Sequence, residues 1–376
     1  MIRLLDRYSD RWHKLKLNGP PALLDFFNKP DQDERELQQL RVLDLSIPTK
    51  LHNRNQTLYL SCGPHAAQLE SLSIKGYMFV KFVNMNLNHL TQLTMVNVSL
   101  PTCLEAVRII PGLVNCVFEG CSMGRLNNDF LLPRKPIKNK TVQRLQFIGD
   151  GALFGAISHH LMCSSLESLL VNNTNGECQN SAYSIISFLE KSRCSLECLS
   201  LVHVNLILDE EYKAVTSLCE LMPTIRSFHP DFSGDFDSFP VHLFKVLSKF
   251  SIIDKRKVPQ YLPLLSSLSL KSKIFYQWDS LLDIFGPHTP RSITRHRRAL
   301  KHVTILVLDP HDRSVGERGN LAVAYNIDVP ILKTILWLRD SAGVTWDVKS
   351  GSDEDEVIAL AVRWYRGSGP VVRTAI

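Results

Sequence analysis

Three pairs of cysteine and histidine residues have spacings that occur in zinc sites: Cys62-x-x-His65, His160-x-x-Cys163 and Cys194-x-x-x-Cys198. Structural zinc needs about four such ligands in a tetrahedral array, and no second pair follows any of these pairs at a recurring distance. The nine cysteines are odd in number and irregularly spaced, which is typical of reduced thiols. The sequence therefore predicts no bound metal.

Motifs for nucleotide binding, metalloprotease chemistry and serine hydrolysis do not occur. The chain holds no G-x-x-x-x-G-K-[ST], G-x-G-x-x-G, H-E-x-x-H or G-x-S-x-G. Gly149-Asp150-Gly151 is too short to enclose a phosphate, and we expect it to form a turn. No nucleophile, base and orienting group stand at a recognisable spacing, so we expect no catalytic residue, no cofactor and no enzymatic activity.

Two short stretches concentrate charge. Residues 291–302 hold seven basic side chains, and residues 353–356 hold four acidic ones. We expect the basic stretch to be a solvated helix face; an acidic partner and a nuclear address are the alternatives. The acidic stretch is expected to be solvated, or to form the first turn of a helix, where the helix dipole favours negative charge.

The overall composition narrows the class of partner. The 376 residues carry 43 Lys and Arg against 37 Asp and Glu, a formal charge of +6 spread along the chain. This balance argues weakly for an acidic partner and not for nucleic acid, which usually needs a concentrated basic stripe. The first residues are charged too early for a secretory signal, and no apolar run reaches the roughly 18 residues that a membrane span requires. We expect a monomer without membrane contact, in the cytoplasm, the nucleus or both.

The clearest feature is an internal repeat. Four segments share the pattern L-x-x-L-x-L: Leu69–Ile74, Leu166–Val171, Leu196–Leu201 and Leu265–Leu270. Weaker copies begin at Trp12, Leu40, Leu90, Leu113 and Val142, and an irregular one at Leu300. From position 12 to position 196 the leading residues are 21 to 30 apart, close to the period of about 20–29 for a leucine-rich repeat.

Helices are expected between these strands, because apolar residues recur there at helical spacing. The predicted helices cover residues 104–110 after Pro101, residues 182–189, residues 212–222 after Asp209, and residues 329–338 ending near Gly343. Pro111, Pro223 and Pro263 each stand two residues before the start of a strand, where a proline ends helical structure. A strand at residues 344–348 and a helix at residues 353–364 are expected to follow.

These patterns predict an α/β fold, a leucine-rich-repeat solenoid with a curved parallel sheet on its concave face and helices on its convex face. We expect the solenoid to occupy residues 1–310 and a C-terminal α/β cap to occupy residues 311–376. Ordinary α/β strands that happen to be rich in leucine are the alternative interpretation.

Side chains between the inward leucines should point to the concave face, because successive side chains of a strand alternate. We expect a protein partner to lie across this face, with Arg144 as the preferred anchor. The predicted protein-binding residues are Asp44, Ser73, Lys75, Gln92, Thr94, Asn115, Glu119, Arg144, Gln146, Ser168 and Asn172.

Two segments resemble a known family. Residues 8–17 (YSDRWHKLKL) resemble the segment just after the F-box in the large fungal family of F-box and leucine-rich-repeat proteins, and residues 111–116 (PGLVNC), after Cys103-Leu104, are similar to another recurrent block of that family. The resemblance covers roughly residues 1–270 and implies a substrate-recognition subunit of a Skp–cullin–F-box ubiquitin ligase.

The F-box itself is not recognised in the chain. Residues 20–24 (PPALL) echo its start, but they follow the Trp12 repeat and lack the expected helices. We therefore expect a Skp-type adaptor to bind only if an F-box lies upstream. A scaffold or truncated receptor without a ligase link is the alternative function.

Overall fold

The computed structural model describes residues 11–19, 39–47, 57–60, 68–76, 79–83, 85–123, 132–174, 181–204, 211–232, 239–253, 256–272, 278–286, 298–307, 327–350, 358 and 362. The chain divides into two compact units, residues 1–194 and residues 195–376. The boundary that we predict at residue 310 lies outside the described residues, so the proposed cap stays a prediction.

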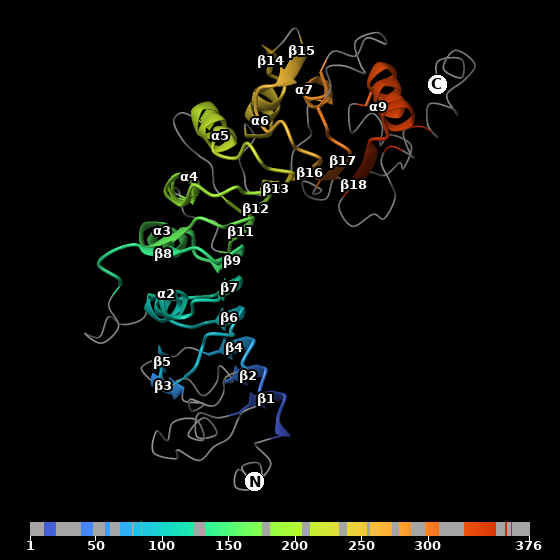
Figure 1. Ribbon diagram of the computed structural model, residues 1–376. Helices are drawn as coiled ribbons and strands as arrows, with labels where there is room; N and C mark the ends of the chain where they lie inside the picture. Colours follow the sequence, from blue (N-terminus) through green and yellow to red (C-terminus); the bar gives the residue numbers. More distant parts are fainter. Residues whose placement is uncertain are drawn as a thin grey trace. The chain divides into compact units, whose positions relative to one another are not determined.

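Each unit contains a parallel sheet whose strands follow one another in the order of the chain (Figure 1). The strands of the first unit are β1 (Lys14–Asn18), β2 (Val42–Ser46), β4 (Ser71–Lys75), β6 (Gln92–Val96), β7 (Asn115–Glu119), β9 (Arg144–Gly149) and β11 (Ser168–Asn173). Those of the second unit are β12 (Cys198–Val202), β13 (Ser227–Phe232), β16 (Ser267–Ser272), β17 (His302–Val307) and β18 (Thr345–Ser350). The α/β class and the parallel sheet are therefore confirmed.

Neighbouring strands share one register. Leu43 stands opposite Leu72, Leu72 opposite Leu93, and the pairing continues through Cys116 to Leu145. These inward residues are at most 1% exposed, as are the leading residues Leu40, Leu69, Leu90, Leu113 and Val142 of the same segments. Each L-x-x-L-x-L segment therefore places three side chains in the core, and burial of such side chains stabilises the fold by about 1.5–3 kcal/mol each.

Helices cover one face of the first unit's sheet, and their labels lie on one side of the strands in Figure 1. They are α2 (Leu100–Ile109), α3 (Gly151–His160) and α4 (Ser181–Ser192). A row of aromatic rings joins the two layers: Phe147 of β9 lies 5.5 Å from Phe154 of α3, which lies 5.9 Å from Phe188 of α4. The predicted helices at 104–110 and 182–189 are confirmed.

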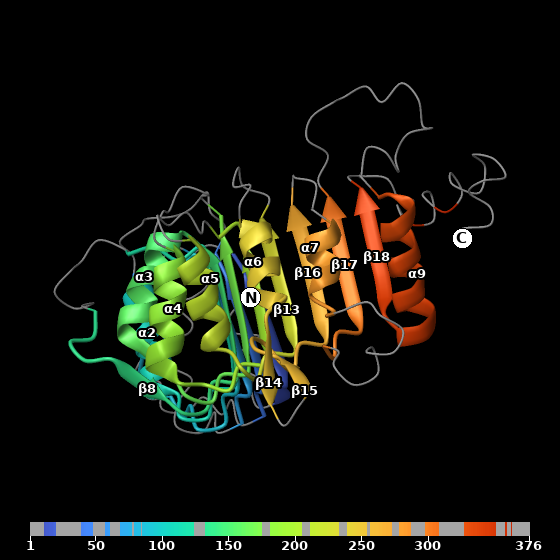
Figure 2. The same ribbon diagram turned by 90° about the horizontal axis from the view of Figure 1, so that it is seen from above.

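The second unit has helices α5 (Glu211–Glu220), α6 (Phe239–Leu247), α7 (Trp278–Asp283) and α9 (Val329–Ala342), the last three visible beside their strands in Figure 2. Asp328 caps α9 by accepting a hydrogen bond from the Ile331 backbone N–H at 2.8 Å. Gly343 ends this helix with φ of 63°, the left-handed conformation that glycine adopts without strain. The helix, its end and the following strand were all predicted, and β18 pairs in parallel with β17.

Three small sheets were not predicted. Strands β3 (Thr57–Leu60) and β5 (Phe79–Phe82) pair in parallel, as do β8 (Ile137–Asn139) and β10 (Leu161–Cys163). Strands β14 (Phe250–Ile253) and β15 (Arg256–Pro259) pair antiparallel. Gly149-Asp150-Gly151 also differs from the expected turn, because Asp150 accepts a hydrogen bond from the Ala152 N–H at 2.8 Å and so caps the start of α3.

The expectation of a solvated basic helix face at residues 291–302 is wrong for Arg298. This side chain is 1% exposed, whereas Lys301 and His302 are exposed and residues 291–297 lie outside the described part. The Arg298 guanidinium donates hydrogen bonds to the carbonyl oxygens of Leu247, Tyr261, Leu262 and Ile284, at 2.6 to 3.3 Å. A charged group tolerates burial here because four backbone acceptors surround it.

Candidate interaction surface

The face of the first unit's sheet that the helices leave uncovered is called the open face. All eleven residues predicted for protein binding lie on it, because each alternates with the buried residues of its strand. Strand register arranges them in three rows: Gln92, Asn115, Arg144 and Ser168; Asp44, Ser73, Thr94 and Gln146; and Lys75, Glu119 and Asn172. Their role in binding stays a prediction.

Apolar side chains on the same face were not singled out from the sequence. Val96, Val117, Ile148 and Leu170 come from four successive strands and are partly exposed. Val117 and Leu170 lie in the row of Thr94 and Gln146, whereas Val96 and Ile148 lie in the row of Glu119 and Asn172. From strand to strand, the four residues therefore alternate between two neighbouring rows and are diagonal neighbours. Diagonal neighbours in a sheet are about 7–8 Å apart, within reach of one contiguous contact. The signal was present in the sequence, at the positions between the inward residues.

Two charges of opposite sign flank this apolar group. Arg144 and Glu119 are both exposed, and neither side chain has an ion pair or hydrogen bond within the described part of the chain. Arg144 stands opposite Asn115, and Glu119 lies four residues further along β7, a distance of about 13 Å at 3.3 Å per residue. The ion pair between Lys16 and Asp44, whose charged atoms lie 3.6 Å apart, is a weak interaction, because the lysine side chain is 66% exposed and water screens it.

Three buried acceptor oxygens on the open face have no hydrogen-bond donor within the described residues: Asp44 Oδ1, Asn115 Oδ1 and Asn172 Oδ1. An unsatisfied buried polar group costs about 1–3 kcal/mol. A ligand that brings donors to these positions recovers part of that cost. The open face therefore offers apolar contact, opposite charges and acceptors, a combination that suits a protein surface.

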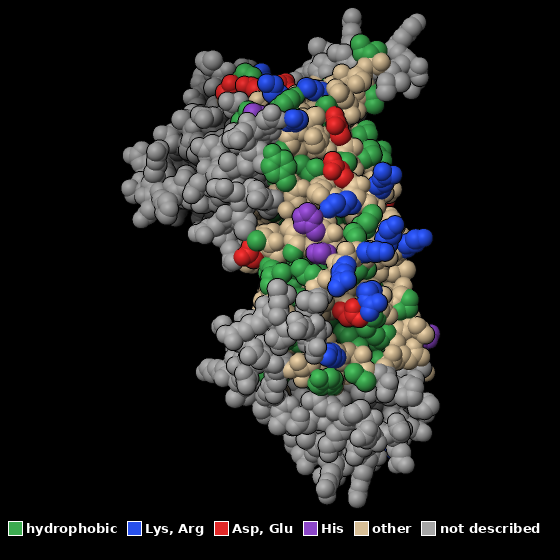
Figure 3. Space-filling view, turned by 90° about the vertical axis from the view of Figure 1, so that its left-hand side faces the viewer, with side chains coloured by type: hydrophobic (Ala, Val, Ile, Leu, Met, Phe, Trp, Pro, Cys, Tyr) green, Lys and Arg blue, Asp and Glu red, His purple; other side chains and the backbone are tan. Residues whose placement is uncertain are grey.

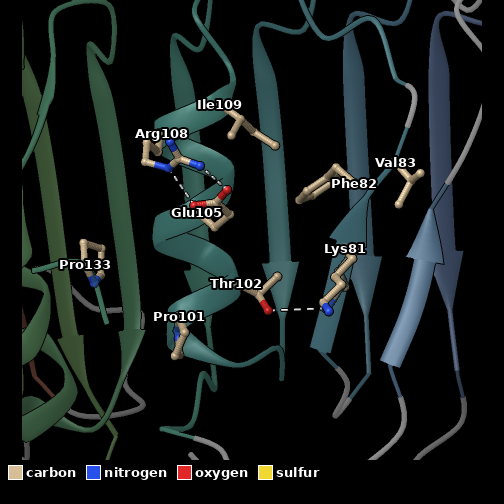
Figure 4. Close-up of a pocket in the computed structure, with 10 residues that line it drawn as sticks. Lys81, Phe82, Val83, Pro101, Thr102, Glu105, Arg108, Ile109 and Pro133 are labelled. Carbon is tan, nitrogen blue, oxygen red and sulfur yellow. Dashed lines mark hydrogen bonds and ion pairs between the residues drawn. The ribbon is translucent and has the colours of Figure 1, made fainter. Parts of the chain in front are cut away.

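A separate cavity lies on the helix side of the first unit, between β5 and α2 (Figure 4). Its volume is about 550 Å³, and its lining includes Phe82, Val83, Thr102 and Ile109. In its wall, Arg108 Nε donates a hydrogen bond to Glu105 Oε2 at 2.7 Å, and this carboxylate raises the pKa of the Arg108 guanidinium. Thr102 is the one hydroxyl in this lining, and its oxygen lies 2.8 Å from Ser99 Oγ.

The cysteine and histidine pairs occupy separate places. Cys163 of β10 is fully buried, and burial raises the pKa of its thiol to about 12, which disfavours the thiolate that binds metals. Cys116 fills an inward leucine position as expected, and Cys103 Sγ lies 3.6 Å from Cys121 Sγ in the core. Within the described ranges, no three His, Cys, Asp or Glu side chains gather around one point, and Cys62 and His65 lie outside those ranges.

No protein-family model matches the chain, and no curated protein is similar to it. None of the described helices combines the length and the hydrophobicity that crossing a lipid bilayer requires.

Proposed function

We propose that the chain is a leucine-rich-repeat protein whose open face binds another protein. The observation that carries the proposal is the agreement between the L-x-x-L-x-L periodicity and the strands. Each of the four clearest segments forms one short parallel strand and buries the same three positions, and within the described residues its strand pairs with the strands of the copies before and after it. Such repeats leave a regular row of side chains on the uncovered face, and sequence changes there do not disturb the core.

The resemblance to the fungal F-box family supports a more specific role. In that role the open face selects a protein for ubiquitination by a Skp–cullin–F-box ligase. The seven described cysteines are free thiols, which fits a reducing compartment such as the cytoplasm or nucleus. A protein-binding scaffold without a ligase link is the second candidate, and the apolar and charged rows of the open face support both equally.

A differential capture experiment tests the open face. The purified chain and the variant Arg144→Ala/Glu119→Ala are immobilised side by side, and captured proteins are quantified by mass spectrometry. We expect one partner to be retained by the native chain and by Lys301→Ala/Lys333→Ala, a control at two exposed sites outside the open face, but reduced at least about tenfold on the open-face variant. A partner set that is unchanged by Arg144→Ala/Glu119→Ala, by Val117→Ser and by Ile148→Ser contradicts the proposal.

The ligase role has its own test. Residues 1–376 are mixed with a purified Skp-type adaptor and analysed by size-exclusion chromatography. We expect no complex, because we recognise no adaptor-binding helices in the sequence. Stoichiometric complex formation would place a divergent F-box within the chain, most plainly in residues 18–40, and would favour the ligase over the scaffold.

A further inference from the structure

The helix side of the first unit carries a concentration of positive charge, here called the basic surface. Its six cationic residues are Arg134, Lys135, Lys138, Lys140, Lys191 and Arg193. His159 and His160 end helix α3, which lies between these cations in the sequence. Glu190 is the one carboxylate in residues 132–141, 158–163 and 189–193. In Figure 3, which faces this side, Lys and Arg side chains gather at mid-height. The charge is local, because the whole chain has a net charge of only +6.

Short elements hold these cations in place. Strand β8 turns Ile137 and Asn139 inward, so Lys138 points outward. The Asn139 side chain fixes the turn after the strand by accepting hydrogen bonds from the backbone N–H groups of Thr141 and Val142, at 2.9 and 2.8 Å. The surface therefore projects from a rigid support, although the cations lie in separate parts of the sequence.

The end of α4 is attached to the same support. Strand β10 pairs with β8, and its Cys163 N–H donates to Ser192 Oγ at 3.1 Å. Lys191 Nζ donates to the Ser158 carbonyl at 3.3 Å, which draws the end of α4 towards the end of α3. Lys191 and Arg193 are thereby held beside the cations of the β8 segment.

Five of these cations have no ion-pair partner in the part of the chain that the structure describes. Arg134, Lys135, Lys138, Lys140 and Arg193 are exposed, and no carboxylate within the described residues lies within ion-pair distance of them. Arg108 of the neighbouring helix α2 shows the contrast, because Glu105 neutralises it. Lone cations at this density repel one another, and an anionic ligand removes that repulsion.

We propose that the basic surface binds an acidic segment of a partner protein, about six residues long. Residues 134–140 span at most about 20 Å when extended, which equals the length of six or seven residues of an extended peptide. Nucleic acid fits less well. Single strands bind where aromatic side chains stack on bases, and among residues 132–141, 158–163 and 189–193 the histidines are the only aromatic side chains. This surface is independent of the open face, so the chain has two distinct contact regions.

The test uses a fluorescein-labelled peptide with six consecutive glutamates and its six-glutamine counterpart. Binding to the purified chain is followed by anisotropy at about 50 and about 150 mM salt. We expect only the glutamate peptide, and not the glutamine peptide, to bind, with an affinity that falls as the salt concentration rises. Lys138→Glu/Lys140→Glu should weaken binding about tenfold, since each reversal replaces an attraction with a repulsion. The control Lys301→Glu/Lys333→Glu, with the same change in net charge at exposed sites, should weaken it less than about twofold.

Three results would overturn the inference. The first is equal weakening by both double variants, which would mean that only the overall charge matters. The second is equal binding of the glutamate and glutamine peptides. The third is tighter binding of a single-stranded RNA or a DNA duplex than of the peptide, together with its loss in Lys138→Glu/Lys140→Glu, which would assign the surface to nucleic acid. Circular dichroism checks that each variant is folded. If Lys138→Glu/Lys140→Glu does not fold, Lys138→Gln/Lys140→Gln replaces it and should weaken peptide binding about threefold, still more than the control variant does.

Discussion

Replacing Arg298 with methionine should destabilise the protein strongly, and the structure provides the magnitude. Burial lowers the pKa of the Arg298 guanidinium to about 10, because desolvation penalises the charged form. Four hydrogen bonds join this charged donor to carbonyl oxygens, and such bonds contribute about 1.5–3 kcal/mol each, a net value that already includes the loss of hydration. Methionine keeps the apolar stem but leaves all four carbonyls without the guanidinium. The expected loss in free energy of unfolding is therefore at least about 3 kcal/mol.

Urea unfolding followed by circular dichroism measures this loss. Lys333→Met removes one positive charge as well, but at an exposed site, and should alter the free energy of unfolding by no more than about 0.5 kcal/mol. Arg298→Lys keeps the charge but offers three donors to four acceptors, so it should fall between the native chain and Arg298→Met. A loss below about 1 kcal/mol for Arg298→Met would refute the reasoning, because it would mean that the four carbonyls find other donors or that the bonds barely exceed the desolvation cost.

Three further predictions follow from other sites. Burial lowers the pKa of His229 in the folded state, so below about pH 6.5 the unfolded state binds more protons than the folded state. The free energy of unfolding should therefore decrease as the pH falls from about 6.5 to the folded-state pKa. In thermal melts at a series of pH values, His229→Gln should reduce that decrease. Phe154→Ala should cost about 3–5 kcal/mol in urea unfolding because it removes the ring between Phe147 and Phe188, whereas Tyr183→Ala, at a side chain 55% exposed, should cost little; equal effects would contradict the ring row. Elemental analysis should find no stoichiometric zinc in the purified protein, and about one equivalent would restore the cysteine–histidine pairs as ligands.

The strands of the main parallel sheet in each unit were predictable because a single physical rule determines them. Leu72 and Ile74 had to face one way in a short strand, and the same spacing in the other copies required the same burial. The open-face rows followed from the same alternation. The apolar group around Val117 was missed only because small and polar side chains dominate the positions between the leucines.

Other features depend on tertiary contacts that the sequence does not display. Strands β8 and β10 have three residues each, too few for a periodic pattern, and they pair although 21 residues separate Asn139 from Leu161. Helix α3 contains Gly151 and Gly155, which lower helix propensity, and its packing through Phe154 compensates. Arg298 resembles its basic neighbours in sequence, and only the fold brings four carbonyl oxygens around it. The basic surface was missed for the same reason, since Lys140 and Lys191 are distant in the chain.

The sequential strand order has a consequence for how the first unit opens. Among the described strands, each pairs with the copies before and after it, and the first, β1, pairs on one side with β2. Unpairing can therefore begin at that end and advance one copy at a time, so backbone amide protons should exchange fastest in β1 and more slowly towards the interior strands. A protein lying across β6, β7 and β9 would have to be released before those strands could separate. Binding at the open face would thus slow hydrogen exchange in several copies at once, well beyond the residues it touches.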